Sequence, residues 1–361
     1  MNNSQLYSQL KNHFPQLKIE KDFPLAPLTT LKIGGPAEIF IQTTTNQQLI
    51  QLFKYLHTIS YPLSSIHFLG NGSNTLISDS GIRGIIIKNT SSNFQLISTP
   101  TTFQNTNTSP ITPTQKTRHY ENDPKKYLSL KQFDYDESNS PLQFVDIDTG
   151  LDLSQAIKKS LAQQVTGLQW FSYIPGQIGG AIWYNAHGGN HHISNVIHNI
   201  TFYNLKTQKT ETVLASNIDW QYDSSFFQQN PHLFILSAIF KLYQGDTHKA
   251  QQIVNRWIAE KKKVQSFNSC GSVFQNLPES ITVPIWGQPR STGWIVDQQL
   301  HLKGKKIGNA QISEKHGNFI LNAGQATASD YLKLIRLVQQ QFKQRWNIDL
   351  PLEVNLLGNF D

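Results

Sequence analysis

Two glycine-rich stretches have the composition of anion-binding loops. One is LGNGSNTLISD at residues 69–79, and the other is IPGQIGGA at residues 174–181. Glycine loops that follow strands present backbone N–H groups to an anion, and no β-carbon keeps a phosphate away from them. Ser73 and Asn74 add side-chain donors for phosphate oxygens. Neither stretch is a Walker sequence or a Gly-x-Gly-x-x-Gly fingerprint, so each taken alone is explained as simply by a tight turn.

The two loops together are more informative than either alone. Pro175 fixes the start of the second turn, and the glycines that follow leave room for a planar ring system to lie flat on the backbone. A dinucleotide with a large planar head requires both features, which indicates flavin adenine dinucleotide (FAD). The predicted cofactor-binding residues are Gly70, Asn71, Gly72, Ser73, Asn74, Pro175, Gly176, Gly179 and Gly180.

Three histidines lie close together in YNAHGGNHHISNV, at positions 187, 191 and 192. No cysteine or carboxylate stands at ligand spacing from them, so we expect no metal site and interpret the segment as a polar loop at the edge of the flavin. His187 in this loop is a candidate for stabilising charge near the flavin.

Composition limits the classes of partner. The chain has 361 residues, a net charge of +7 and a single cysteine, Cys270. The length predicts two or three domains, and one cysteine allows no internal disulfide, which favours a cytoplasmic protein. The lysines are scattered, and AEKKK at 259–263 is interpreted as a solvated helix face, so we expect no nucleic-acid partner, although a phosphorylated ligand fits the excess charge. No apolar run approaches the ~20 residues of a membrane helix, so we expect no membrane insertion.

Alternating helical and strand patterns predict an α/β or α+β fold. Helical spacing is found at residues 4–14, 47–59, 151–164, 248–263 and 330–346. Residues 196–213 form a predicted hairpin that turns near Lys206, and 233–243 a buried strand. Residues 91–141 are rich in Ser, Thr, Asn and Pro, and we interpret them as a largely flexible insertion with room for an embedded hairpin. Ser329 or Asp330 is the predicted cap of the last helix.

The order of several motifs resembles the UDP-N-acetylenolpyruvoylglucosamine reductases, flavoenzymes of peptidoglycan precursor synthesis. The matching segments are TTLKIGGPA at 29–37, LGNGSNTLISD at 69–79, GLQWFSYIPGQIGGA at 167–181, GSVFQN at 271–276, the long segment 291–335, and LPLEVNLLG at 350–358. The resemblance implies an α+β fold with a PCMH-type FAD-binding domain in two subdomains at 1–246, interrupted by the insertion. A smaller α+β substrate-binding domain then spans 247–361.

This resemblance also implies an activity and a partner set. NADPH would reduce the flavin, and the reduced flavin would pass hydride to the enolpyruvyl double bond of UDP-N-acetylglucosamine enolpyruvate, giving UDP-N-acetylmuramate. Ser272 matches the family's proton donor, Glu353 its carboxylic acid, and Tyr222 and Asn276 its substrate-contacting residues. The short stretch between Tyr243 and the following helix resembles the shorter form of the family, without a tyrosine capping loop. We expect a monomer, and we interpret Cys270 as a packing residue.

One position departs from the resemblance. Asp223 stands where the family has an arginine that holds the enolpyruvyl carboxylate, and an aspartate there repels the carboxylate. Arg290 or a nearby lysine is the predicted substitute cation. The change leaves open a family member that binds flavin and UDP-sugar without efficient turnover, and a flavin-dependent oxidase of the same fold is the other alternative.

Overall fold

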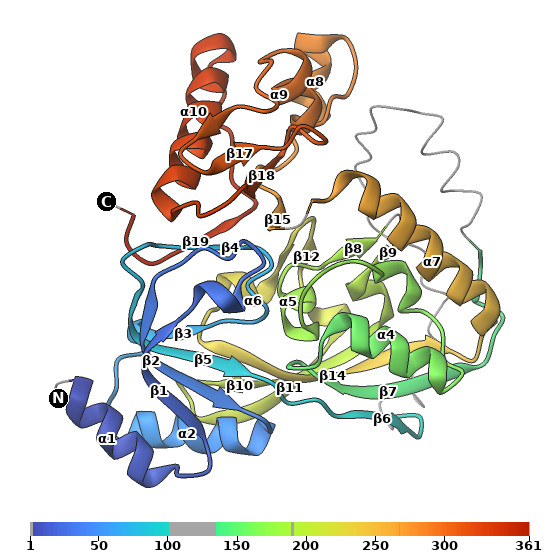
Figure 1. Cartoon of the computed structure of the whole chain (residues 1–361). Coiled ribbons are helices and arrows are strands. Elements are labelled where there is room, and N and C mark those ends of the chain that lie inside the picture. The colour runs from blue at the N-terminus through green and yellow to red at the C-terminus, as the bar shows by residue number, and fades with distance from the viewer. Residues whose placement is uncertain (1–2, 101–134, 189–190, 267, 361) are drawn as a thin grey trace.

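The computed structural model describes residues 3–100, 135–188, 191–266 and 268–360 (Figure 1). Three larger sheets, of four, five and four strands, organise these residues. Helices and strands are mixed along the chain, and most strand pairs within the sheets are antiparallel. The fold is therefore α+β, as the sequence predicts.

The N-terminal sheet has the strand order β1-β2-β5-β3 and carries two helices. These elements are α1 (Asn3–His13), β1 (Lys18–Pro24), β2 (Pro36–Thr43), α2 (Asn46–Thr58), β3 (Ile66–Phe68) and β5 (Ile82–Asn89). In α2 the apolar residues at helical spacing, from Leu49 to Leu56, are all buried, which confirms the predicted helix. Thr45 caps its start by accepting a hydrogen bond from the Gln48 N–H at 3.1 Å.

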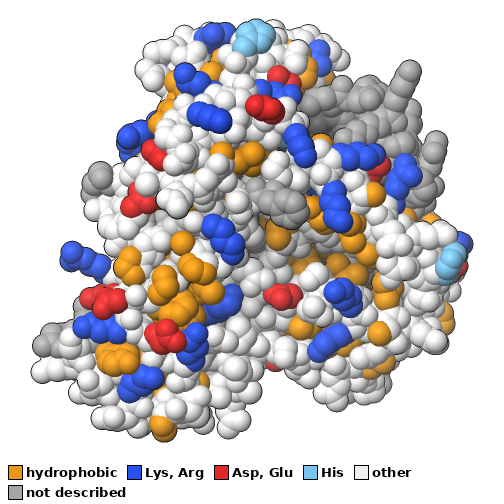
Figure 2. All heavy atoms as spheres, viewed as in Figure 1, with side chains coloured by type: hydrophobic (Ala, Val, Ile, Leu, Met, Phe, Trp, Pro, Cys, Tyr) orange, Lys and Arg blue, Asp and Glu red, His pale blue; other side chains and the backbone are white. Residues whose placement is uncertain are grey.

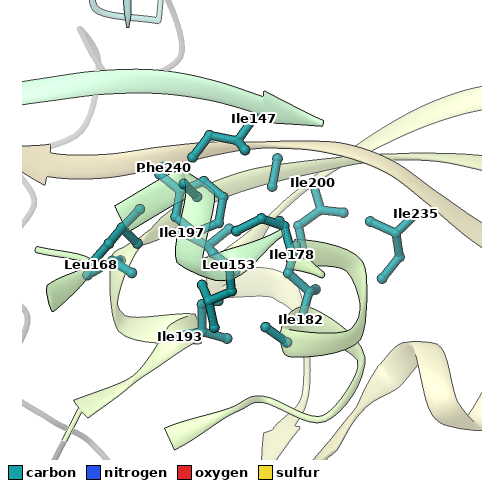
Figure 3. Packing of buried hydrophobic residues seen from close by; sticks show 14 of the residues in the cluster. Ile147, Leu153, Leu168, Ile178, Ile182, Ile193, Ile197, Ile200, Ile235 and Phe240 are labelled. Atoms are coloured by element: carbon teal, nitrogen blue, oxygen red, sulfur yellow. The ribbon is translucent and has the colours of Figure 1, made fainter. Parts of the chain in front are cut away.

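A five-stranded antiparallel sheet follows, in the order β11-β10-β14-β7-β6. Its elements are β6 (Phe94–Ile97), β7 (Leu142–Asp148), α4 (Leu153–Ala162), α5 (Ile178–Trp183), β10 (Ile197–Asn204), β11 (Lys209–Leu214) and β14 (Leu233–Tyr243). The predicted hairpin is β10–β11. Figure 3 shows Ile178 and Ile182 of α5 in the same apolar cluster as Ile200 of β10 and Phe240 of β14. Ile178 and Ile182 therefore anchor the glycine-rich helix α5 in this core.

The insertion was predicted to begin at residue 91, which is too early. Residues 94–97 form strand β6, which pairs antiparallel with β7 at the edge of the sheet. The strand has only four residues, none of them buried, and it lies beside a polar segment, so it gives no periodic pattern. Glu137 near the other end is buried and accepts hydrogen bonds from the Thr166 hydroxyl and from Gln169 Nε2. The rest of the predicted insertion, residues 101–134 with any embedded hairpin, lies outside the described residues.

The C-terminal part has a four-stranded sheet in the order β15-β18-β17-β16. Its elements are α7 (Thr247–Val264), β15 (Ser269–Ser272), α8 (Glu279–Trp286), α9 (Thr292–Gln298), β16 (Lys306–Ile307), β17 (Ala310–Ile312), β18 (Phe319–Asn322) and α10 (Ala328–Trp346). The predicted stripe of α10, from Tyr331 to Phe342, is buried in this part's core. The predicted cap was wrong, because Thr327 is the N-cap and Asp330 completes a capping box with it.

The chain end returns to the N-terminal part. Strand β19 (Asn355–Leu357) pairs in parallel with β4 (Thr75–Ile77), and Leu31 and Leu76 belong to the C-terminal apolar cluster. The Asp79 carboxylate accepts hydrogen bonds from Ala328 N at 2.7 Å and Ser329 N at 2.9 Å, at the start of α10. Helix α7 packs Val254 against the cluster of the five-stranded sheet. The division after residue 246 therefore stays a prediction.

Several short elements complete the described chain. They are β8 (His187–Gly188), β9 (His191–His192), β12 (Trp220–Gln221), β13 (Ser224–Ser225), α6 (Phe226–Gln229), and the 3₁₀ turns at Ala26–Leu28, Leu63–Ser65, Gln169–Phe171, Ile193–Val196 and Ala215–Asn217. Basic side chains are scattered over the face in Figure 2, with acidic ones among them. No helix in the described ranges is both long and apolar enough to span a membrane.

We expect Asp79→Ala to lower the free energy of unfolding by about 1 kcal/mol, because two N–H groups in the first turn of α10 lose a charged acceptor. Asp79→Asn keeps an acceptor oxygen without the charge and should lose less. Urea unfolding followed by circular dichroism measures both variants. If Asp79→Ala unfolds at the same urea concentration as the wild type, water replaces this contact without loss of stability, and the prediction is wrong.

Candidate functional site

A cavity of about 1230 Å³ lies where the three parts of the chain meet. Its walls come from the loop 69–74, the loop 173–177 with α5, the turn between β12 and β13, the end of β15, and the segment before β19. A volume of this size exceeds that of an ordinary drug-sized ligand site. The cavity has room for a dinucleotide together with a second ligand.

The two glycine loops meet in this cavity. Ser73 Oγ donates a hydrogen bond to the Pro175 carbonyl at 2.9 Å, which joins the loops directly. Asn71 Nδ2 donates to Asp152 Oδ1 at 2.5 Å, and Asn71 Oδ1 accepts from Lys88 Nζ at 3.1 Å. The Asn71 side chain therefore fixes the first loop, and Lys88 and Asp152, which the sequence analysis missed, hold it.

The predicted glycines divide into two groups by what a β-carbon would meet. At Gly180 it would meet no atom within 4 Å, and at Gly176 only Ser73 Oγ at 3.2 Å. At Gly179 it would lie 3.0 Å from the Thr149 β-carbon, and at Gly72, where φ is +53°, 2.8 Å from Thr29 Cα. Gly180 thus leaves space in the cavity, whereas Gly176, whose φ is +136°, Gly72 and Gly179 are required by backbone conformation or packing. A β-carbon at Gly70 would lie 3.2 Å from Gln177 Oε1, in the second loop.

The structure brings Ser272 and Glu353 together in this cavity, far apart as they are in sequence. Ser272 ends β15, and both residues line the cavity. Glu353 N donates to the Val273 carbonyl at 2.9 Å, and Asn74 Nδ2 donates to the Glu353 carbonyl at 2.9 Å. Glu353 lies just before β19. The backbone of Glu353 is held between the Ser272 strand and the first glycine loop.

Glu353 is a carboxyl group in a site that disfavours its charge. Burial raises its pKa well above that of an ordinary glutamate, and the negative charge of Asp223 raises the pKa further. The positive charge of Lys261 acts in the opposite direction. Burial and the charge of Asp223 therefore both favour the protonated form of the Glu353 carboxyl group.

The remaining two predicted site residues also line the cavity. Tyr222 and Asp223 form the turn between β12 and β13. Asn276 Oδ1 accepts a hydrogen bond from Thr292 N at 3.0 Å, which fixes this side chain near the start of α9.

Comparison with known proteins identifies the family. The model for the UDP-N-acetylenolpyruvoylglucosamine reductase C-terminal domain matches residues 260–357. UDP-N-acetylenolpyruvoylglucosamine reductases from Acaryochloris marina and a Synechococcus species are 30% and 32% identical to this chain over 349 residues, which cover 95% of it and 94% and 93% of the relatives. The chain belongs to the UDP-N-acetylenolpyruvoylglucosamine reductase family.

A solved member of the reductase family shares the fold. The crystal structure of UDP-N-acetylenolpyruvylglucosamine reductase from Thermus caldophilus matches with a TM-score of 0.67 and 22% identity, covering 95% of this chain and all of the solved one. The predicted α+β class and the family resemblance are both confirmed.

Asp223, the position that departs from the family resemblance, lies beside His187. Asp223 Oδ1 lies 3.3 Å from His187 Nδ1, and the rings of His187 and Tyr222 are 5.0 Å apart. The predicted substitute Arg290 is not among the described residues that line the cavity. Its guanidinium instead lies 3.9 Å from the centre of the Trp294 ring.

The other two histidines of the segment have different surroundings. His191 stacks on Trp170 with ring centroids 4.2 Å apart, and His192 is buried. Burial lowers the pKa of His192, and the nearby charge of His187 lowers it further, so His192 is neutral. No three His, Cys, Asp or Glu side chains gather as a metal-ligand set within the described ranges.

Lys261 is a cavity residue that the sequence analysis missed. The expectation of a solvated helix face at 259–263 holds for Lys262 and Lys263, which are exposed, but Lys261 is half-buried and lines the cavity. The sequence does indicate that Lys261 points inward, because it follows Val254 by seven residues and Trp257 by four. These positions share one face of a helix, and Val254 is packed inside.

Cys270 is inaccessible and weakly acidic. Its Sγ lies 3.2 Å from the Tyr331 hydroxyl, and burial raises the pKa of the thiol to about 12. A thiol with so little thiolate is a poor nucleophile. This agrees with the prediction of a packing residue.

We expect iodoacetamide at pH 8 to label Cys270 at least roughly 100-fold more slowly in the folded protein than in urea, because only the thiolate reacts. The chain has one cysteine, so mass spectrometry reports this thiol alone. Labelling of the folded form should still accelerate above pH 9, where the unfolded chain levels off. Equal rates in both states would contradict the buried, protonated thiol.

Proposed function

We propose that this chain is an NADPH-dependent flavoenzyme that reduces UDP-N-acetylglucosamine enolpyruvate to UDP-N-acetylmuramate in peptidoglycan precursor synthesis. The observation that carries the proposal is the meeting of Ser272 and Glu353 with both glycine loops in one cavity. The single thiol and the dispersed charge agree with a cytoplasmic, monomeric enzyme without a nucleic-acid partner.

The residues present fit FAD as the cofactor. The open space at Gly180 suits a flat group lying on the backbone, and the loop from Gly70 to Asn74 suits phosphates. When bound, FAD supplies hydride transfer from NADPH to the enolpyruvyl double bond. The chain's own residues then have two tasks, which are to hold the substrate and to deliver a proton.

Ser272 and Glu353 are the groups that move this proton. Hydride addition to one carbon of the double bond leaves an enolate-like anion at the other, which requires a proton to become the lactyl ether. Ser272 donates this proton from its hydroxyl, and Glu353, whose pKa is raised by burial, lies in the same cavity to stabilise the charge. Asn276 and Tyr222 contact the substrate. The C-terminal segment from residue 247 supplies Ser272, Asn276 and Glu353, and acts as the substrate-binding domain.

Anaerobic NADPH oxidation with and without UDP-N-acetylglucosamine enolpyruvate tests the function. We expect consumption that depends on this substrate and a product with the mass of the lactyl ether. Ser272→Ala should retain flavin reduction by NADPH and slow flavin reoxidation by substrate by roughly 100-fold or more, because the anion is left without its proton donor. Flavin that is reduced but never reoxidised in the wild type would support the alternative of an impaired family member.

Flavin content tests the second glycine loop. We expect Gly180→Leu to fold and yet purify with under roughly one tenth of the wild-type flavin, because its side chain enters the open space of the cavity. Gly179→Ala is the matched control, since its β-carbon meets Thr149 and should lower thermal stability more than flavin content. Full flavin occupancy in Gly180→Leu would show that the second glycine loop does not contact the cofactor at this position.

A further inference from the structure

Gln177 is a buried polar residue of the second glycine loop to which the proposed function gives no task. Gln177 is only 7% exposed, and it lines the cavity. A buried amide group lowers stability unless its polar atoms have hydrogen-bond partners. Each end of the Gln177 amide should therefore have a partner, either in the protein or in a ligand.

The nitrogen end of this amide is held by backbone at the ends of two strands. Gln177 Nε2 donates hydrogen bonds to the Asn89 carbonyl at 2.9 Å and to the Gly150 carbonyl at 2.7 Å. Asn89 is the last residue of β5, and Gly150 follows β7. Because carbonyl oxygens only accept hydrogen bonds, the nitrogen must be the atom that faces them. The two contacts therefore determine which way the amide points.

The oxygen end of the amide faces the first glycine loop. Gln177 Oε1 accepts no hydrogen bond from any residue in the described part of the chain, and it is not one of the unpartnered polar atoms that the protein encloses completely. A β-carbon at Gly70 would lie 3.2 Å from Oε1 and, apart from its chain neighbours, within 4 Å of no other described atom. Gln177 Oε1 is thus an acceptor with open space beside it.

This acceptor lies where the two glycine loops are joined. Consecutive residues at the end of β5 hold both loops, because Lys88 Nζ donates to the Gly70 carbonyl and the Asn89 carbonyl accepts from Gln177. Helix α5 begins directly after Gln177 and carries Gly180, which leaves space in the cavity. Gln177 therefore adjoins the loop that suits phosphates and the helix that suits a flat ring.

An acceptor without a partner favours a ligand group that can donate. Phosphate oxygens at neutral pH only accept, so a diphosphate cannot satisfy Gln177 Oε1, whereas a hydroxyl group can. FAD carries hydroxyl groups on its ribityl chain, which connects the flavin ring to the diphosphate. A cofactor with its diphosphate at Gly70 to Asn74 and its ring at Gly180 would have this chain beside Gln177.

We infer that Gln177 is a further cofactor-binding residue, whose Oε1 accepts a hydrogen bond from a ribityl hydroxyl group of FAD. This inference rests on the proposed function, because it concerns the cofactor named there. The glycine loops offer space and donors, and Gln177 adds an acceptor that distinguishes a hydroxylated chain from an apolar linker. Because Nε2 is already held by two carbonyls, little side-chain entropy is lost when Oε1 binds.

FAD analogues that each lack one ribityl hydroxyl group test this contact. Isothermal titration calorimetry of the flavin-free protein gives the Kd of FAD and of each analogue. We expect the wild type to bind at least one analogue about 5-fold or more weakly than FAD, because one hydrogen bond is lost. In Gln177→Met, which has no acceptor oxygen, this ratio should fall below about 2-fold. Loss of the two Nε2 contacts should weaken FAD and the analogue alike, so the ratio reports on Oε1.

Two further variants serve as controls. Gln177→Lys keeps N–H donors for both carbonyls and has no acceptor, so it should also lose the preference for FAD, even if Gln177→Met does not fold. Gln229→Met is the same substitution at another residue that lines the cavity, and it should keep the wild-type ratio.

Three results would overturn the inference. The first is equal Kd values for FAD and every ribityl analogue in the wild type, and the second is an unchanged ratio in Gln177→Met and Gln177→Lys. The third is a preference that depends on Gln177 only when the missing hydroxyl belongs to the adenosine ribose, which would assign Oε1 to that sugar. If the wild type binds no FAD at all, the proposed function fails as well.

Discussion

The site depends on the hydrogen bond between Asn74 and the backbone of Glu353. The last residues of the chain return across the molecule, and β19 pairs in parallel with β4, directly after the first glycine loop. Asn74 Nδ2 holds the Glu353 carbonyl, and Asn355 N donates to the Asn74 carbonyl at 3.1 Å. The loop that would bind the cofactor and the carboxyl group that would act on the substrate are therefore one structural unit. Any displacement of the loop moves Glu353 with it.

The same arrangement determines the protonation of Glu353. Burial of its carboxyl group raises the pKa, and Asp223, in the turn between β12 and β13, adds a like charge. An arginine at position 223 would favour the ionised carboxylate, so the identity of this residue affects the acid as well as the substrate. The positive charge of Lys261 acts in the opposite direction and lowers the pKa of Glu353. The pKa of Glu353 thus depends on residues from elements that are distant from one another in the sequence.

Local patterns predict much of this fold and little of its site. Leu49 to Leu56 in α2 and Tyr331 to Phe342 in α10 follow helical spacing, and the structure buries both stripes. The edge strand β6 was missed because few of its residues are buried. Asp79 at the start of α10 could not be predicted, because the contact joins residues that are distant in sequence. Composition identifies glycine loops, but only neighbouring atoms show that Gly180 faces open space while Gly179 is packed.

The histidine and the aspartate show what a pattern along the chain misses. Read along the chain, Asp223 departs from the family resemblance and suggests an impaired enzyme, while His187 stands in a separate polar segment. In space the Asp223 carboxylate lies 3.3 Å from His187 Nδ1. A substitution that reverses charge is harmful when its new charge faces the substrate alone. Here the new carboxylate has an imidazole beside it, which no sequence pattern links to position 223.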